Sequence, residues 1–295
     1  MLEGIIVKGV GGLYTIDTAE GTVTARPRGI FRKKEISLSP LVGDKVSVSM
    51  IERDNNAGVI EKIHERKTLL MRPKVANVTQ AVIVFACKEP DLHLDLLDRF
   101  IIQSEAAAVN SIIVFNKIDL LSGKDREKTE GIRNIYEKAG YKTVLLSTYK
   151  DVGIDKLEAV LDGETTVLAG PSGAGKSSIF NMLCNEKLME TGELSMKIRR
   201  GKHTTRHSQL VKLGTDSYLV DSPGFSSLTF NGIDADILKN LFLEFKGLSS
   251  ECRFANCNHI DEPDCMVKQG VAQGIISETR YKRYLNFYEE LRGGQ

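Results

Sequence analysis

One octapeptide limits the possible folds of this chain more than any other feature of its sequence. Residues 170–177 read GPSGAGKS, which matches the pattern G-x-x-x-x-G-K-[ST] without a gap. A β-type run, TTVLA, ends just before it, and a helical pattern begins near Lys176. Glycines let such a loop turn its N–H groups inward, and the helix N-terminus adds a dipole that favours anions. The chain is therefore predicted to contain an α/β domain with a phosphate-binding loop between a strand and a helix.

The residue types of this loop predict separate roles in holding a polyphosphate. Lys176 is expected to reach the β- and γ-phosphates, and the Ser177 hydroxyl is expected to ligate Mg²⁺. The loop alone leaves the base and the reaction open, because a nucleotide kinase would hold ATP in the same way. The residues expected to contact the nucleotide here are Gly170, Pro171, Ser172, Gly173, Ala174, Gly175, Lys176, Ser177 and Ser178.

Residues 116–119 read NKID and indicate which base is bound. They directly follow SIIVF, an apolar run typical of a buried parallel strand. Guanine presents N1–H and N2–H₂ as adjacent donors, and the Asp119 carboxylate can accept both, whereas adenine would leave it unpaired. Asn116 is expected at the other edge of the ring, and the Lys117 stem beside the nucleoside. The motif therefore favours a guanine nucleotide over ATP.

A third motif, DSPG at residues 221–224, follows a β-type run. Asp221 is expected to hold the Mg²⁺ shell through water, and the Gly224 N–H to contact the γ-phosphate. The order of the motifs is unusual, because NKID precedes the phosphate loop by about fifty residues. A circular permutation explains it, since such a site is assembled in space and tolerates moved chain ends. The permutation also joins the segment after Asp221 to the C-terminal region, through which nucleotide state could be transmitted.

The strand and helix patterns change along the sequence and predict a multi-domain α/β chain. The predicted domains are an OB-fold, RNA-binding domain at 1–68, a permuted nucleotide-binding domain at 69–230 and a zinc-binding, mostly helical domain at 231–295. The first has short β runs broken by turn residues, which predict a five-stranded barrel; an SH3-like barrel is the alternative. The second alternates strand and helix patterns, as in a doubly wound sheet. Strands are expected at 4–10, 13–17, 21–25, 45–51, 58–64, 81–86, 111–115, 143–146, 166–169 and 219–220, and helices at 94–108, 125–138, 154–161 and from 176 onward.

Three of the five cysteines fall within a short C-terminal stretch that also holds a histidine. The spacing Cys252-x₄-Cys257-x-His259-x₅-Cys265 offers three thiolates and an imidazole, a set that suits tetrahedral Zn²⁺. Four protein ligands leave no open position, so one structural Zn²⁺ is expected. The region reads as polar and poor in core residues, so the metal is expected to replace the missing core.

Charge is balanced overall, with 40 Lys and Arg against 39 Asp and Glu, but two stretches are basic. Residues 26–34 in the predicted barrel and RYKR at 280–283 are each expected to form a basic surface. An OB fold holds single-stranded nucleic acid on such a groove, with stacking side chains beside it. Two basic surfaces fit a large RNA platform better than a small substrate. The basic residues of the first stretch are Arg26, Arg28, Arg32, Lys33 and Lys34.

Composition argues against several classes of protein. Apolar residues make up 41% and charged residues 27% of the 295 residues, which is typical of a globular chain. The sequence has no apolar run of about eighteen residues, as a membrane span would need. It also begins without the apolar segment of a signal peptide. A cytoplasmic protein without a membrane partner is therefore expected. We also expect the chain to be a monomer.

With these motifs the sequence resembles the circularly permuted GTPases, and specifically the ribosome small-subunit-dependent GTPase A family. The resemblance covers essentially the whole chain and includes GKHTT at 201–205, the family's switch I signature. It implies a GTPase, with GTP or GDP and Mg²⁺ as ligands, that binds the small ribosomal subunit and its rRNA. It also implies that the subunit stimulates GTP hydrolysis during its late maturation. The family's base-binding Ser-Ala-Lys reads STYK at 147–150 here, so Ser147 and Thr148 are expected to contact the base through their backbone.

Conventional small GTPases often place Gln directly after D-x-x-G to orient the attacking water, but this chain has Phe225 there. Intrinsic turnover is therefore expected to be slow. His203, which the resemblance also favours, is the candidate for positioning water, and Thr205, or else Thr204, for ligating Mg²⁺. Two alternatives stay open. A nucleotide kinase does not explain NKID and DSPG, whereas Phe225 favours a GTP-gated RNA-binding module with negligible turnover.

Overall fold

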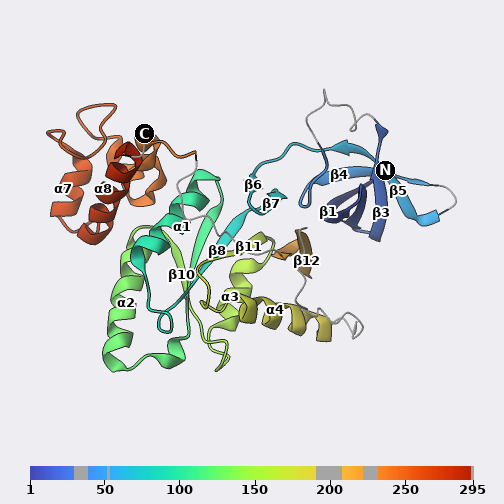
Figure 1. The fold of residues 1–295 in the computed structure, drawn as a ribbon, viewed down its shortest axis with the longest axis horizontal. Helices are drawn as coiled ribbons and strands as arrows, with labels where there is room; N and C mark the ends of the chain where they lie inside the picture. Colours follow the sequence, from blue (N-terminus) through green and yellow to red (C-terminus); the bar gives the residue numbers. More distant parts are fainter. Residues whose placement is uncertain (30–38, 52–53, 191–207, 222–231, 294–295) are drawn as a thin grey trace. The chain divides into compact units, whose positions relative to one another are not determined.

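The structure, a computed structural model, describes residues 1–29, 39–51, 54–190, 208–221 and 232–293 (Figure 1). By their internal contacts the described residues fall into two compact units. No described helix combines the length and apolar character needed to cross a membrane. The predicted domain boundaries at 68 and 230 stay predictions. The first unit takes Met1–Ala81, Asp155–Ala169 and Lys176–Ser226, and the second takes Val82–Ile154, Gly170–Gly175 and Ser227–Gln295.

Five strands of the first unit form the barrel that the turn pattern predicts. Their order is β1-β2-β3-β5-β4, and β1 also pairs with β4, which closes the barrel. β3 runs parallel to β5 while the other pairs are antiparallel. This Greek-key closure favours the OB fold over the SH3-like alternative. Ile6, Ile16 and Val46 fill the interior and have no exposed surface. The strands are β1 (Leu2–Val10), β2 (Leu13–Thr18), β3 (Gly21–Pro27), β4 (Lys45–Ile51) and β5 (Asp54–Ile63).

Three further strands form in the first unit, and two of them, β11 (Thr165–Ala169) and β13 (Ser217–Asp221), lead into predicted motifs. β11 runs parallel to β13, whereas β12 (Gln209–Gly214) is antiparallel to β13. β12 was not predicted, because only Leu210 and Leu213 of it are buried and its apolar signal is weak. The other elements of this part of the chain are helix α4 (Lys176–Glu190), helix α3 (Ile154–Leu161) and a hairpin of β6 (Leu69–Met71) and β7 (Lys74–Ala76).

The second unit contains strands whose side chains are almost wholly buried, as their continuous apolar runs predict. β9 (Asn110–Asn116) lies between β8 (Gln80–Ala86) and β10 (Lys142–Leu145), and β9 and β10 are parallel. Helices α1 (Leu94–Ala106) and α2 (Gly123–Lys138) connect successive strands, as a parallel pair requires. The predicted strand–helix alternation is therefore confirmed, and NKID emerges at the carboxyl end of β9.

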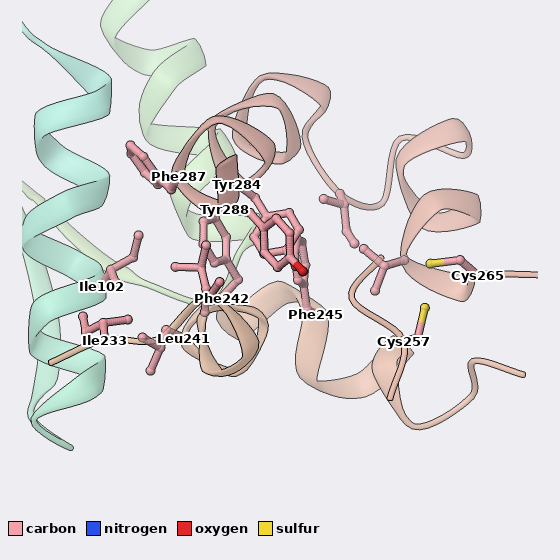
Figure 2. Close-up of a cluster of buried hydrophobic side chains, with 14 residues drawn as sticks. Ile102, Ile233, Leu241, Phe242, Phe245, Cys257, Cys265, Tyr284, Phe287 and Tyr288 are labelled. Atoms are coloured by element: carbon pink, nitrogen blue, oxygen red, sulfur yellow. The ribbon is translucent and has the colours of Figure 1, made fainter. Parts of the chain in front are cut away.

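An aromatic core holds the C-terminal helices together (Figure 2). Phe242, Phe245 and Tyr284 are at most 1% exposed, and the rings of Phe245 and Tyr284 meet edge to face with centroids 5.0 Å apart. The prediction that this region lacks core residues is wrong, because its aromatic side chains are dispersed through a polar sequence and converge only on folding. The elements are α5 (Ala235–Leu238), η3 (Lys239–Leu241), η4 (Leu243–Phe245), α6 (Lys246–Ser249), α7 (Met266–Ala272) and α8 (Glu278–Gly293).

Two arginines of the predicted basic surface RYKR are buried instead. Arg280 and Arg283 of α8 are 1% and 8% exposed, and both donate hydrogen bonds to the Asp98 carboxylate of α1. Arg280 also donates to the Glu244 carboxylate at 2.5 and 3.0 Å, and Tyr136 OH donates to Asp98 Oδ1 at 2.8 Å. Buried charges need partners of this kind. The expectation that these two arginines face an RNA is therefore wrong.

Candidate nucleotide site and metal centre

The end of β9 and the phosphate loop are joined by a hydrogen bond. Asn116, the last residue of β9, is 1% exposed, and its Nδ2 donates to the Ala174 carbonyl at 2.9 Å. Gly175 has φ of +101°, and a Cβ there would lie 2.2 Å from Asn116 Nδ2. Glycine alone suits both this backbone conformation and this close approach. The structure thus brings NKID together with residues 170–175 of the phosphate loop, which lie in the same unit, and uses one amide hydrogen of Asn116 to hold them.

Asp119 is held by the side chain of Ser147, in the loop after β10. Ser147 Oγ donates to Asp119 Oδ1 at 2.6 Å and accepts from the Lys150 N–H at 3.1 Å. Ser147 is fully buried, and its backbone N–H and C=O both bond to Val152, at 3.0 and 3.1 Å. Among the described residues, Asp119 Oδ2 accepts no hydrogen bond. The half-buried carboxylate is thereby fixed through one oxygen and keeps the other as an acceptor.

Ser147 contacts Asp119 through its side chain, a role that the sequence does not indicate. Its N–H is taken by the Val152 carbonyl, so the hydroxyl rather than the backbone is the group that reaches Asp119. The next residue differs: within the described part of the chain, the Thr148 N–H has no acceptor. The expected backbone contact of Thr148 with the base stays a prediction.

Lys117 turns the chain away from β9 in the left-handed conformation, with φ of 62°. Its Nζ donates to the Glu89 carbonyl, and Pro90 Cδ lies 3.4 Å from the position that a Gly173 Cβ would take. The segment after β8 therefore contacts both motifs, through a backbone carbonyl and a proline ring. No sequence signal marks these residues, because a carbonyl contact is available to every residue type.

The phosphate loop has the backbone that its glycines predict. Gly170 has φ of +127°, and a Cβ there would lie 2.1 Å from the Val84 carbonyl oxygen of β8. Ala174 is fully buried, whereas residues 176–178 form the first turn of α4. Of the other loop residues, Ser172, Gly173, Ser177 and Ser178 are exposed, and Pro171, Gly175 and Lys176 are half-buried.

Asp221 ends β13 and is the described residue of the DSPG motif. It is half-buried and accepts a hydrogen bond from Gln209 Nε2 at 3.0 Å. The other residues named for the region around the γ-phosphate lie outside the described residues, and so does part of the first basic stretch. They are His203, Thr204, Thr205, Gly224 and Phe225, and Arg32, Lys33 and Lys34.

The four predicted metal ligands converge in the C-terminal region, where Figure 2 shows two of them, Cys257 and Cys265, beyond the aromatic core. The ligand atoms of Cys252, Cys257, His259 and Cys265 all lie within 4.8 Å of one another. His259 Nδ1 is 3.6 Å from Cys252 Sγ and 3.4 Å from Cys265 Sγ, and these sulfurs are 4.0 Å apart. Tetrahedral zinc would place its ligands about 3.6 Å apart for N–S and about 3.8 Å for S–S. The donor set and its spacing therefore fit zinc.

Neighbouring residues fix the imidazole of this cluster. His259 Nε2 lies 3.1 Å from Ser249 Oγ, and its carbonyl accepts from Tyr281 OH at 2.6 Å. Its ring meets that of Phe245 edge to face, with centroids 5.7 Å apart. Burial, with the charge of Lys239 adding to it, lowers the pKa of His259 to about 4. The imidazole is thus neutral at pH 7, which is the form that ligates a metal.

Comparisons with known proteins agree with this geometry. The family model described as RsgA GTPase matches residues 63–231, and the one described as RsgA N-terminal domain matches residues 3–60. Curated proteins called "Small ribosomal subunit biogenesis GTPase RsgA" are similar over nearly their full length. The protein from Alkaliphilus metalliredigens is 43% identical, over 99% of this chain and 98% of its own. One from Clostridium perfringens is 45% identical, over 98% of each chain.

Two solved structures share the architecture. YloQ, described as a circularly permuted GTPase, is similar with a TM-score of 0.83 and 34% identity, covering 100% of this chain and 96% of that one. YjeQ from Thermotoga maritima gives a TM-score of 0.84 and 35% identity, covering 99% of each chain. The GTPase model alone matches more than half of the residues. This chain therefore belongs to the RsgA family of circularly permuted GTPases.

Proposed function

We propose that the chain binds GTP with the base at Asp119 and the phosphates on the loop at 170–178. The observation that carries the proposal is the Asp119 carboxylate, whose Oδ1 is held by Ser147 while Oδ2 has no described partner. The adjacent N–H donors of guanine suit such a carboxylate, and adenine has no matching pair. The bond from Asn116 to Ala174 supports one continuous site, because it ties the base motif to the loop that would hold the phosphates.

Three neighbouring groups would complete base recognition. Asn116 uses one amide hydrogen on the Ala174 carbonyl, so its second can donate to a ring nitrogen at the other edge of the base. The Thr148 N–H, which has no described acceptor, would donate to the guanine carbonyl. The Lys117 stem would lie along the nucleoside, since its Nζ is fixed on the Glu89 carbonyl.

Oxygen ligands for Mg²⁺ are available among the predicted residues. Ser177 offers an exposed hydroxyl in the first turn of α4, and Asp221 offers a half-buried carboxylate at the end of β13. Thr205 is the proposed further ligand, ahead of Thr204. Hard oxygen donors of this kind suit Mg²⁺, which usually keeps several waters. When bound, the ion neutralises charge that develops on the β- and γ-phosphates, and Lys176 would add a fixed positive charge.

Hydrolysis is proposed to depend on His203. Phe225 stands where conventional GTPases often have Gln, and its ring can neither donate nor accept a hydrogen bond to water. The His203 imidazole can do both, and it lies in a segment expected to close over the γ-phosphate. We therefore expect slow turnover by the chain alone.

The relatives' name places GTP hydrolysis in the biogenesis of the small ribosomal subunit, and we assign this chain the same task. We propose that the subunit and its rRNA bind the chain and stimulate turnover during late maturation. Arg26 and Arg28 are exposed on the barrel, where Arg28 pairs with Glu61 at 2.7 Å. Such residues supply phosphate contacts to RNA. We propose further that the chain acts as a monomer in the cytoplasm, without a membrane partner.

Phosphate release from GTP and from ATP, each with and without purified small ribosomal subunits, tests this function. We expect slow GTP turnover by the chain alone, strong acceleration by subunits, and no turnover of ATP. A GTP-gated RNA-binding module, which Phe225 favours, would bind GTP and subunits without turnover, and a kinase would transfer phosphate to an acceptor other than water. Lys176→Ala should abolish turnover with and without subunits, and unchanged rates would contradict the phosphate-loop assignment.

A further inference from the structure

Gln209, the first residue of β12, connects the barrel with the end of β13. Its backbone is in register with Asp221 of β13 and also with Lys8 of the barrel strand β1. Its side chain contacts Asp221 as well, because Nε2 donates to Oδ2 at 3.0 Å. None of the sequence motifs includes Gln209, so the nucleotide-binding proposal leaves this contact unexplained.

Side chains also anchor β12 to the barrel. Lys212 Nζ lies 2.7 Å from Asp17 Oδ2, and the Tyr218 hydroxyl donates to the same oxygen at 2.5 Å. Asp17 belongs to β2, so one barrel carboxylate holds both β12 and β13. A side chain that projects from a strand fixed in this way has a defined position, and the Gln209 amide is therefore preorganised.

The Asp221 carboxylate has little else to fix it. It is half-buried, and among the described residues Gln209 is its hydrogen-bond donor. Cys184 of α4 is 3% exposed, and burial, with the charge of Asp221 adding to it, raises the pKa of its thiol to about 12. The charge of the carboxylate is therefore felt by a buried group of α4, the helix that begins at the phosphate loop.

We propose that Gln209 is a positioning residue for Asp221: its amide holds Oδ2 so that Oδ1 is presented to the water shell of Mg²⁺. The inference rests on the proposed role of Asp221 in nucleotide binding. An amide donor suits this position, because it orients a carboxylate without neutralising its charge. A carboxylate at position 209 would repel Asp221, and a methyl group would leave it free to rotate.

The test is a Mg²⁺ titration of the dissociation of fluorescent GDP from full-length wild-type protein and three variants. Gln209→Ala is expected to raise the Mg²⁺ concentration for half-maximal retention of nucleotide by about tenfold, as for loss of a group that orients a metal ligand. Gln209→Glu keeps the shape but replaces the donor with a charge, so a larger shift is expected. Lys212→Ala removes one anchor of the same strand but keeps the Tyr218–Asp17 bond and the pairing of β12 with β13, so a clearly smaller shift than that of Gln209→Ala is expected.

Two further readouts separate positioning from folding. For both Gln209 variants we expect unchanged thermal unfolding and unchanged nucleotide affinity without Mg²⁺, together with recovery of turnover at saturating Mg²⁺. An unaltered Mg²⁺ requirement in both variants would overturn the inference. An equal shift in Lys212→Ala would also overturn it, because barrel docking would then be the cause. Wild-type protein that binds no GTP, or binds it without Mg²⁺ dependence, would contradict the proposed function and remove this inference with it.

Discussion

The Cys₃His cluster and the base site at the end of β9 are both built from short motifs, yet they use their side chains in opposite ways. In the cluster all ligand atoms lie within 4.8 Å of one another, and His259 and Cys265 are at most 2% exposed. In the base site, Asp119 is half-buried, with one oxygen held by Ser147 and the other without a described partner. The cluster directs all its ligand atoms at one position that fits a zinc ion, whereas the base site keeps an acceptor oxygen for the proposed nucleotide.

The groups that hold the side chains of the two sites in place also differ. The cluster adjoins the aromatic core, where the ring of Phe245 contacts His259. In the base motif, Asn116 and Lys117 are instead held by backbone carbonyls, those of Ala174 and Glu89. A side chain that ligates a structural metal can use all its polar atoms within the protein. A side chain that recognises a nucleotide must keep some of its polar atoms free for the nucleotide.

Removing the metal should have the largest effect, because structural zinc contributes about 10 kcal/mol or more to small metal-dependent folds. Chelation, or Cys265→Ser, is expected to expose the core around Phe245 and to remove hydrogen-exchange protection from residues 250–268. Cys87→Ser is the control, since Cys87 lies outside the cluster. A C-terminal region that stays protected without metal would show that the aromatic core suffices, and the contrast with the base site would then lose its basis.

Replacing the buried Arg280 tests whether an ion pair, besides the metal, stabilises the C-terminal region. Arg280→Ala leaves the Glu244 carboxylate buried without its arginine and removes one of the two arginines that donate to Asp98. We therefore expect a loss of about 3–5 kcal/mol in the free energy of unfolding. Arg253→Ala is the matched control, because its pair with Asp264 is about two-thirds exposed and should contribute less than about 1 kcal/mol. Urea unfolding of both variants measures the difference. Equal losses would contradict the burial argument.

A smaller effect, confined to the nucleotide, is expected at Ser147. Ser147→Ala removes the hydrogen bond that orients the Asp119 carboxylate, and a bond to a charged group is worth about 1.5–3 kcal/mol. Titration calorimetry should therefore show weaker GTP binding with little change in zinc content. Thr148→Ala is the neighbouring control, because the proposed contact of Thr148 uses its backbone. Equal affinity in Ser147→Ala and wild-type protein would show that Asp119 does not need this support.

Much of the fold could be predicted wherever the signal is local. β4 has the predicted bounds, and β9 extends its predicted range by one residue at each end, because buried strands read as apolar runs between turn residues. The strand β12 and the hairpin of β6 and β7 could not be predicted in this way. They are short and partly exposed, and their pairing partners decide their conformation.

In the candidate site, too, residues of local motifs could be predicted and partners distant in the sequence could not. Asn116, Asp119 and the four metal ligands could be chosen from sequence, because these motifs carry their chemistry in residue type and spacing. Their supporting partners could not. Glu89 contacts Lys117 through a backbone carbonyl, and the pairing of β12 with β13 is what brings the Gln209 side chain to Asp221. From sequence, Arg280 is predicted to be an exposed basic residue, because its partner Asp98 lies 182 residues away in the chain.

Base selectivity of Asp119→Asn is the sharpest single test of how this chain recognises its nucleotide. Competition between GTP, ATP and xanthosine triphosphate would be measured for the variant and for wild-type protein, with zinc content and thermal unfolding as controls. We expect wild-type protein to prefer GTP and Asp119→Asn to prefer the xanthosine nucleotide, because an amide donates where the carboxylate accepted and xanthine presents a carbonyl there. A folded, zinc-bound Asp119→Asn variant that still prefers GTP would contradict recognition of guanine by Asp119.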